Sequence, residues 1–231
     1  MIKIENTDVY GWDATIRGMR NPLNSWDKSD TLLAELGVYG CDDCVHRYED
    51  CAEFLQVNNG CLKLGENDLK LMKNLSKAGN DHGKFLRMIT VTMDITAPLY
   101  WWKEFDAYKV GTVANSCSTM HKIHAKEFEL DDFSLDKLCD IPDCVYDTID
   151  TLNVYREEYL KTKDKRCWWY LIQLLPSSYN QKRTVQLNYQ VLKQMYFARK
   201  NHKLDEWHTF CEWCETLPYF KEICIDIYDK E

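Results

Sequence analysis

The residues best suited to bind a charged ligand lie in two stretches of the chain. Residues 98–120 carry Lys103, Lys109 and Ser118 among aromatic side chains, and a long apolar run ends at Arg199. Lysine binds phosphate as a point charge. A serine hydroxyl can donate to a phosphate oxygen, helped by the backbone N–H groups where a helix begins. These residues indicate a site for a phosphorylated small molecule. The alternative is that Ser118 only caps a helix and that Arg199 lies along the apolar surface or pairs with an acid.

The first stretch has the frame of a known motif. From Pro98 it reads Pro-Leu-Tyr-Trp-Trp-Lys-Glu-Phe-Asp-Ala-Tyr-Lys-Val, and after four more residues it continues Asn-Ser-Cys-Ser-Thr-Met. It resembles the central signature of the flavin-dependent thymidylate synthases, in which a proline and an Arg-Gln stretch precede Arg-His-Arg, seven residues and a serine. Counting back from Asn115 puts the Arg-His-Arg positions at residues 108–110, and counting forward from Pro98 puts them at 107–109. Both counts leave Lys109 as the cation.

The resemblance implies roles for particular residues of this stretch. Lys103 and Glu104 stand where the family holds the nucleotide with Arg-Gln, and Ser116 replaces the motif glutamate. Asn115 and Ser118 are retained. The implied nucleotide-binding residues are therefore Lys103, Glu104, Lys109, Asn115, Ser116 and Ser118, while Tyr108 would contact the cofactor.

Two further blocks extend the resemblance over about 120 residues. Residues 80–87 stand where the family has a Gly-His-x-Ser-Pro-Phe-Glu-His segment, and Lys84 and Arg87 are the implied cofactor contacts there. Asn188 and Arg199 reproduce the eleven-residue spacing of the family's Asn and Arg, with Gln190 in place of a middle arginine. Asn188 and Arg199 would then bind the nucleotide and Gln190 the cofactor. Arg199 matches the arginine at the pyrimidine ring, where positive charge stabilises a ring carbonyl, and is the implied catalytic residue.

The resemblance implies a homotetramer with sites shared between subunits, binding a pyrimidine nucleotide such as dUMP. If active, the protein would transfer a one-carbon unit from methylenetetrahydrofolate to C5 of dUMP with FAD as cofactor. The low number of arginines favours an alternative, a non-catalytic protein that sequesters or senses a nucleotide, because several phosphates call for several guanidinium groups. A third interpretation is an interaction subunit with tryptophan-rich interfaces at 101–102 and 207–213.

Composition narrows the classes of function. The chain has 231 residues, 45% of them hydrophobic, and a net charge of −8, which argues for a folded protein and against general nucleic-acid binding. No apolar run reaches the length of a membrane span, and no signal peptide is visible, so we expect a cytoplasmic protein. The 11 cysteines are scattered, which favours reduced core thiols over a metal centre. The strongest metal candidates are Cys41, Cys44, His46 and Cys51, with Cys211 and Cys214 as a second pair.

These residues have to be positioned by elements that the hydrophobic pattern predicts. We expect one domain over residues 1–231, of the α+β class, rich in helix with a modest central sheet. A strand is predicted over 85–96, with Ile89, Val91, Met93 and Ile95 on one face. Helices are predicted over 9–19, 29–36, 68–75, 147–161, 167–175, 185–199 and 204–216. The aromatic residues Tyr100, Trp101 and Trp102 are expected in the core or at an interface.

Overall fold

A computed structural model of the chain describes residues 2–35, 55–57 and 60–228. The chain divides into two compact units, each assembled from separated segments. The first unit takes residues 1–5, 94–109 and 114–185, and the second takes residues 6–93, 110–113 and 186–231. One domain over residues 1–231 stays a prediction.

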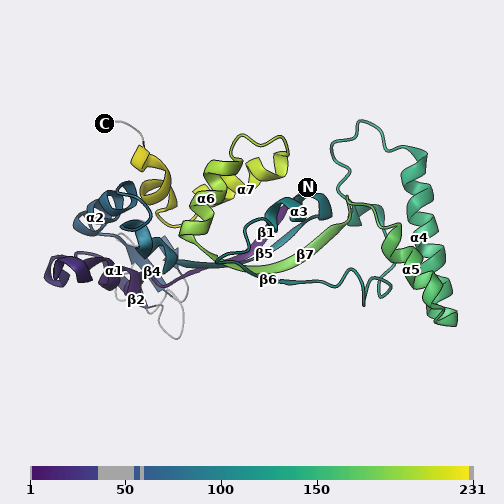
Figure 1. Ribbon diagram of the computed structural model, residues 1–231, viewed down its shortest axis with the longest axis horizontal. Coiled ribbons are helices and arrows are strands. Elements are labelled where there is room, and N and C mark those ends of the chain that lie inside the picture. Colours follow the sequence, from purple (N-terminus) through teal and green to yellow (C-terminus); the bar gives the residue numbers. More distant parts are fainter. Residues whose placement is uncertain (1, 36–54, 58–59, 229–231) are drawn as a thin grey trace. The chain divides into compact units, whose positions relative to one another are not determined.

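Four strands form one sheet in the order β1–β5–β7–β6 (Figure 1). They are β1 (Lys3–Tyr10), β5 (Thr90–Pro98), β6 (Val113–Ser116) and β7 (Asn180–Asn188). β5 lies between β1 and β7, and Val91, Met93 and Ile95 on it are at most 1% exposed. A strand turns every second side chain to the same face. The alternation seen in the sequence is confirmed as the buried face of β5.

Three strands of this sheet lead directly into helices. β1 is followed by α1 (Trp12–Arg20), β5 by α3 (Leu99–Phe105) and β7 by α6 (Tyr189–Arg199). Gly11 makes the first junction in the left-handed region, with φ of 90°, and a Cβ there would collide with the Met88 carbonyl oxygen. Asn188 makes the third, because its side-chain oxygen accepts the Val191 N–H at 3.1 Å and so caps α6.

The first unit contains a helical hairpin. α4 (Asp143–Thr162) and α5 (Lys165–Gln173) lie side by side (Figure 1), which confirms the helices predicted over 147–161 and 167–175. Asp164 begins α5 by accepting the Arg166 N–H at 2.8 Å. Leu152 and Leu171 are fully buried and belong to a small core with Phe128 and Phe133.

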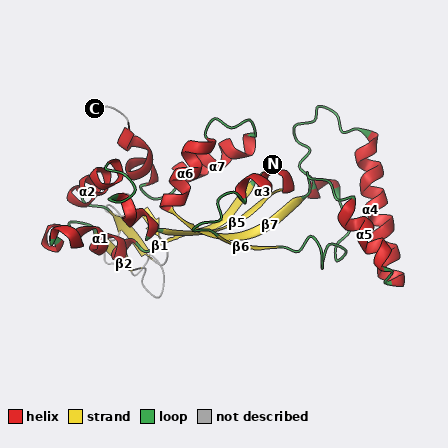
Figure 2. Cartoon of the chain, in the orientation of Figure 1, coloured by secondary structure: helices red, strands yellow, loops and turns green. Residues whose placement is uncertain are grey.

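The second unit contains α2 (Glu66–Lys77), α7 (Asp205–Glu215) and a three-stranded sheet (Figure 2). That sheet pairs β2 (Leu32–Glu35) and β3 (Leu55–Val57) antiparallel on either side of β4 (Gly60–Lys63). Short helical turns cover Gly83–Arg87, Lys221–Ile225 and Asp226–Tyr228. The helices predicted over 9–19, 68–75 and 204–216 are confirmed as α1, α2 and α7, with shifted ends; Val9 and Tyr10 belong to strand β1 instead.

Three element predictions are wrong in part. Residues 32–35 were expected in a helix but form β2, because pairing with β4 outweighs the helix propensity of a Leu-Leu-Ala-Glu sequence. Residues 185–188 were also expected in a helix but end β7, where Val185 and Leu187 are buried on alternate positions. Residues 85–87 form a 3₁₀ turn ahead of β5 rather than its beginning.

A buried ion pair joins α1 to α2 in the second unit. Arg20 Nε donates to Asp68 Oδ1 at 2.6 Å, and both side chains are at most 4% exposed. The Ser29 and Thr31 hydroxyls donate to the other carboxylate oxygen at 2.7 and 2.6 Å. Burial acts to raise the pKa of Asp68, but hydrogen bonds from Thr31, Ser29 and Arg20 together hold the pKa below its usual value. The carboxylate is thus ionised and fully bonded.

We expect Asp68→Asn to lower the free energy of unfolding by about 3–5 kcal/mol, because it leaves the Arg20 guanidinium buried without its counter-charge. The control Asp13→Asn breaks the exposed pair with Arg17 and should cost less than about 1 kcal/mol. Urea unfolding measures both, and equal midpoints would contradict the role of Asp68. Since the folded pKa lies below the unfolded value of about 4, the Asp68 contribution is present above that pH and lost as pH falls through the folded pKa.

Candidate functional site

The signature stretch forms α3 and the turn after it, in the first unit. Trp101, Trp102 and Phe105 are at most 2% exposed, so the aromatic residues of α3 form core, as expected. Lys103 is exposed on α3, and Lys109 is exposed beyond the end of the helix. Helical spacing separates the buried indoles from the Lys103 ammonium group. Glu104 and Tyr108 are half-buried and have partners within the chain.

Arg183 is a functional candidate that the sequence reasoning missed. It lies on β7, its guanidinium carbon is 4.1 Å from the centre of the Trp102 ring, and it donates to Asp106 Oδ1 at 2.8 Å. A third contact runs from Nε to the Gln181 side-chain oxygen at 3.0 Å. Its side chain is 15% exposed. This arginine stiffens the end of α3 from which Lys103 projects. Reading residues 180–188 as a strand would have revealed Gln181 and Arg183 as neighbours on one face.

The second half of the signature lies on an edge strand. Asn115 and Ser116 belong to β6, all of whose residues are exposed, and the chain then bonds to β7 through Cys117 N and Lys182 O at 2.9 Å. Ser118 Oγ accepts the backbone N–H groups of Met120 and His121 at 3.3 and 2.8 Å. No helix begins there, so the expected helix start at Ser118 is wrong and a tight turn takes its place. The exposed hydroxyl can still donate its proton to a ligand oxygen.

The third block of the resemblance, Asn188 to Arg199, forms α6 and its N-cap in the second unit. Asn188 caps the helix, and Gln190 Nε2 donates to Asn80 Oδ1 at 3.2 Å. Arg199 ends the helix with its guanidinium carbon 4.9 Å from the centre of the buried Trp207 ring. A guanidinium near the face of an indole is attracted by the ring, and its N–H groups remain able to donate hydrogen bonds.

The predicted residues therefore fall in both units. Lys103, Glu104, Tyr108, Lys109, Asn115, Ser116 and Ser118 belong to the first, and Lys84, Arg87, Asn188, Gln190 and Arg199 to the second. Lys84 and Arg87 are exposed on the 3₁₀ turn whose other side buries Phe85 and Leu86. Within the second unit, Gln190 lines a pocket.

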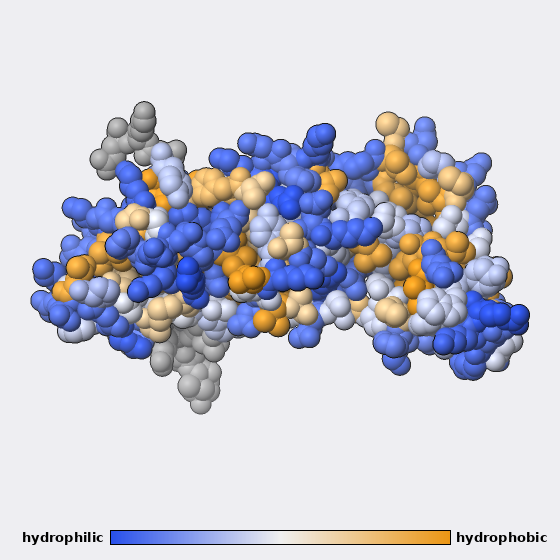
Figure 3. All heavy atoms as spheres, viewed as in Figure 1, coloured by the Kyte–Doolittle hydropathy of each residue, from blue (hydrophilic) through white to orange (hydrophobic). Residues whose placement is uncertain are grey.

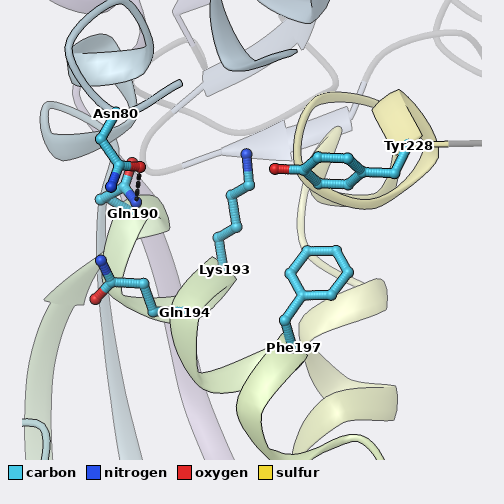
Figure 4. Close-up of a pocket in the computed structure, with 6 residues that line it drawn as sticks. All are labelled: Asn80, Gln190, Lys193, Gln194, Phe197 and Tyr228. Atoms are coloured by element: carbon cyan, nitrogen blue, oxygen red, sulfur yellow. Dashed lines mark hydrogen bonds between the residues drawn. The ribbon is translucent and has the colours of Figure 1, made fainter. Parts of the chain in front are cut away.

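This pocket of about 400 Å³ lies beside α6 (Figure 4). Its lining residues are Asn80, Gln190, Lys193, Gln194, Phe197 and Tyr228. Lys193 extends into the space between Gln190 and Tyr228 (Figure 4), although it is only 7% exposed. Its Nζ donates to the Ser76 carbonyl oxygen at 3.4 Å and lies 5.1 Å from the centre of the Tyr228 ring. Neither partner is an anion. The pocket combines two aromatic side chains, three amides and one ammonium group, a set that can hold a ring with polar edges.

The two groups of cysteines predicted as metal candidates differ in what the structure says of them. Cys41, Cys44, His46 and Cys51 lie outside the described residues. Cys211 and Cys214 are buried in α7, where burial raises the pKa of the Cys211 thiol to about 11 and raises the pKa of the Cys214 thiol well above its usual value. Such thiols remain protonated at neutral pH and serve as core residues. Among the described residues, no three potential ligands gather as a metal site.

Comparison with known proteins identifies the fold. No family model matches the sequence, and no curated protein matches it. Among solved structures, it is similar to thymidylate synthase X (ThyX) from Helicobacter pylori with FAD and dUMP, with a TM-score of 0.65 and 14% identity over 100% of both chains. A second complex of that enzyme gives a TM-score of 0.66 over 97% of this chain and 99% of the other. The fold is that of the flavin-dependent thymidylate synthases.

A further structural neighbour is the UMP/dUMP methylase PolB from Streptomyces cacaoi bound with 5-Br dUMP. Its TM-score is 0.53 and its identity 14%, over 94% of this chain and 89% of that chain. At this identity the likeness concerns the fold, so the chemistry has to be argued from the residues present. No helix among the described residues is long and apolar enough to cross a membrane.

We expect Lys193→Met to leave the free energy of unfolding unchanged or to raise it by about 1 kcal/mol. Methionine nearly matches the length of lysine and removes a buried charge that has no anionic partner in its described contacts. Urea unfolding measures the effect. The control Lys193→Ala should destabilise by about 2 kcal/mol or more, since it leaves a cavity. A loss with methionine as large as that with alanine would show that the ammonium itself holds the unit together.

Proposed function

We propose that this protein binds a pyrimidine nucleotide of the dUMP type. The observation that carries the proposal is the full-length likeness to two ThyX structures that hold FAD and dUMP. PolB, whose structure holds 5-Br dUMP, supports the same ligand class. Three different features of the chain are compatible with it: an exposed lysine on α3 and another just after it, an exposed serine turn, and a guanidinium over an indole.

The proposed nucleotide contacts follow from the chemistry of these groups. Lys103 and Lys109 attract a phosphate, and Ser118 can donate to it. Arg199 presents N–H donors suited to a pyrimidine carbonyl, the part of the ring where negative charge develops when C5 becomes nucleophilic. The rest of the nucleotide would contact Asn115, Ser116 and Glu104. Asn188 caps the helix that carries Arg199.

One-carbon transfer to C5 of dUMP is the activity that this fold suggests, and FAD is the cofactor that it implies. The proposed cofactor residues suit a flavin diphosphate poorly. Lys84 and Arg87 are exposed, Gln190 bonds to Asn80, and Tyr108 carries a phenol rather than a cation. Of these four proposed cofactor residues, Arg87 has the only guanidinium group, where a diphosphate favours several.

A specific observation therefore favours a second candidate, a nucleotide-binding protein without catalysis. Among the described residues of the signature, 98–120, the cations are Lys103 and Lys109, and the neighbouring Arg183 is held by Asp106. Two ammonium groups suffice for a nucleotide phosphate. These two ammonium groups leave little positive charge in the signature to bind a flavin and a folate as well.

Thermal unfolding with dUMP tests nucleotide binding. A dUMP concentration of about 100 Kd should stabilise the protein by about 2.7 kcal/mol. Arg199→Gln should remove most of this stabilisation, whereas Arg166→Gln, an exposed arginine on α5, should retain it. No stabilisation by dUMP or any other pyrimidine nucleotide would refute the proposal. A visible flavin spectrum with tritium release from 5-tritiated dUMP would establish catalysis, and a colourless protein that binds dUMP would establish the second candidate.

We also propose self-assembly, as in the homotetramer that the resemblance implies. Large apolar side chains are exposed on the α4–α5 hairpin, and Figure 3 shows hydrophobic surface, in orange, where that hairpin lies. They are Tyr146, Val154, Leu160, Trp169, Tyr170 and Leu174, between 38% and 65% exposed. Such a patch marks an interface more often than a bare surface.

The mass in solution tests assembly. We expect light scattering to give about four times the chain mass of 27.4 kDa at micromolar concentration. Val154→Glu with Trp169→Glu should shift the protein toward smaller species, because charges are costly in an apolar interface. Asp150→Asn, also on α4, is the control. A monomer in the parent protein would contradict the proposal.

A further inference from the structure

Four basic side chains gather around His124 and Tyr159 in the first unit. The His124 ring lies edge-on to the Tyr159 ring, 4.8 Å away, and Lys163 Nζ is 5.5 Å from the centre of the same ring. Arg156 stands one turn before Tyr159 on α4, and Lys163 follows the last residue of that helix in the left-handed backbone region. Lys122 precedes His124 by two residues. The segment that carries Ser118 thus runs on into this cluster.

Two donors of the cluster have no partner. His124 Nδ1 and Arg156 Nε are shielded from solvent, and neither makes a hydrogen bond within the described chain. A buried polar group left unbonded costs free energy, so such groups normally have a partner. An outside molecule can take up the hydrogen bond of either nitrogen once that side chain turns toward the surface.

The charge around these donors is one-sided. Within the described residues, none of the four basic side chains forms an ion pair with an acid, although the chain as a whole carries −8. Burial, together with the positive charges of Lys163, Lys122 and Arg156, lowers the pKa of His124. The imidazole is therefore neutral at pH 7 and can donate from one ring nitrogen. The other three groups supply the positive field.

We propose that Lys122, His124, Arg156 and Lys163 form a binding site for a phosphate oxyanion. A tetrahedral oxyanion accepts several hydrogen bonds at once, which matches the guanidinium and imidazole donors, and the two lysines add point charges. Inorganic phosphate and the phosphate group of a nucleotide carry the same chemistry. This site goes beyond the proposed nucleotide contacts, since none of its four residues belongs to them.

The titration of His124 tests the site directly. The ring signals of the six histidines are followed by NMR, with His124 identified from His124→Gln. Saturating inorganic phosphate should raise the pKa of His124, because an adjacent anion stabilises the imidazolium form. Chloride at equal ionic strength is the control. An unchanged His124 titration, or the same change with chloride, would overturn the proposal.

Matched variants separate this site from general surface charge. Arg156→Gln and Lys163→Gln should each weaken phosphate binding about tenfold or more. Lys161→Gln removes the same charge two residues from Lys163 but belongs to a pair with Glu157, so it should change binding less than about twofold. Lys163 is exposed, so its variant should fold even if Arg156→Gln does not. Equal effects of Lys161→Gln and Lys163→Gln would count against a defined site.

Comparing dUMP with deoxyuridine identifies the source of the oxyanion. If dUMP raises the pKa of His124 and deoxyuridine does not, the site holds the phosphate of the nucleotide. If inorganic phosphate saturates the site but dUMP binds nowhere, the oxyanion site stands and the proposed function fails. If dUMP stabilises the protein while His124 responds to neither compound, the proposed function stands and the oxyanion site is refuted.

Discussion

The structure depends on the burial of one face of β5 and on the direct passage from strand to helix. Val91, Met93 and Ile95 are shielded almost completely, so the strand cannot slip by one residue without turning this face outward. That fixed register determines where β5 ends, at Pro98, and therefore where α3 begins. The same arrangement recurs at Asn188, which ends β7 and caps α6. Residues on both helices are placed by junctions that contain no intervening loop.

Helical spacing then separates packing from chemistry. On α3 the two tryptophans are buried and Lys103 faces solvent, while Arg183 from β7 closes over Trp102 and pairs with Asp106. On α6, Arg199 rests on Trp207 in a similar manner. In each case a guanidinium carbon lies over an indole ring, where the ring attracts the positive charge.

The buried polar groups differ in how fully they are bonded, and this difference indicates their role. Asp68 accepts bonds from Arg20, Ser29 and Thr31 and needs nothing further, which identifies it as structural. Lys193 has one long hydrogen bond and an aromatic ring, and His124 and Arg156 each keep a nitrogen without a partner. Since unbonded buried donors are costly, a protein retains them where a ligand or water completes the bonding.

The sequence by itself determined the α+β class, the buried face of β5, five of the helices and the aromatic core of α3. These features follow from the local spacing of apolar residues, which can be read directly from the sequence. The tertiary structure decided that residues 32–35 and 185–188 are strands, because their apolar residues fit either period and only pairing with another strand selects one. It alone revealed Arg183 on Trp102, Lys193 in its pocket and the cluster around Tyr159. Those groups come together from positions distant in the sequence, and no spacing along the chain records such contacts.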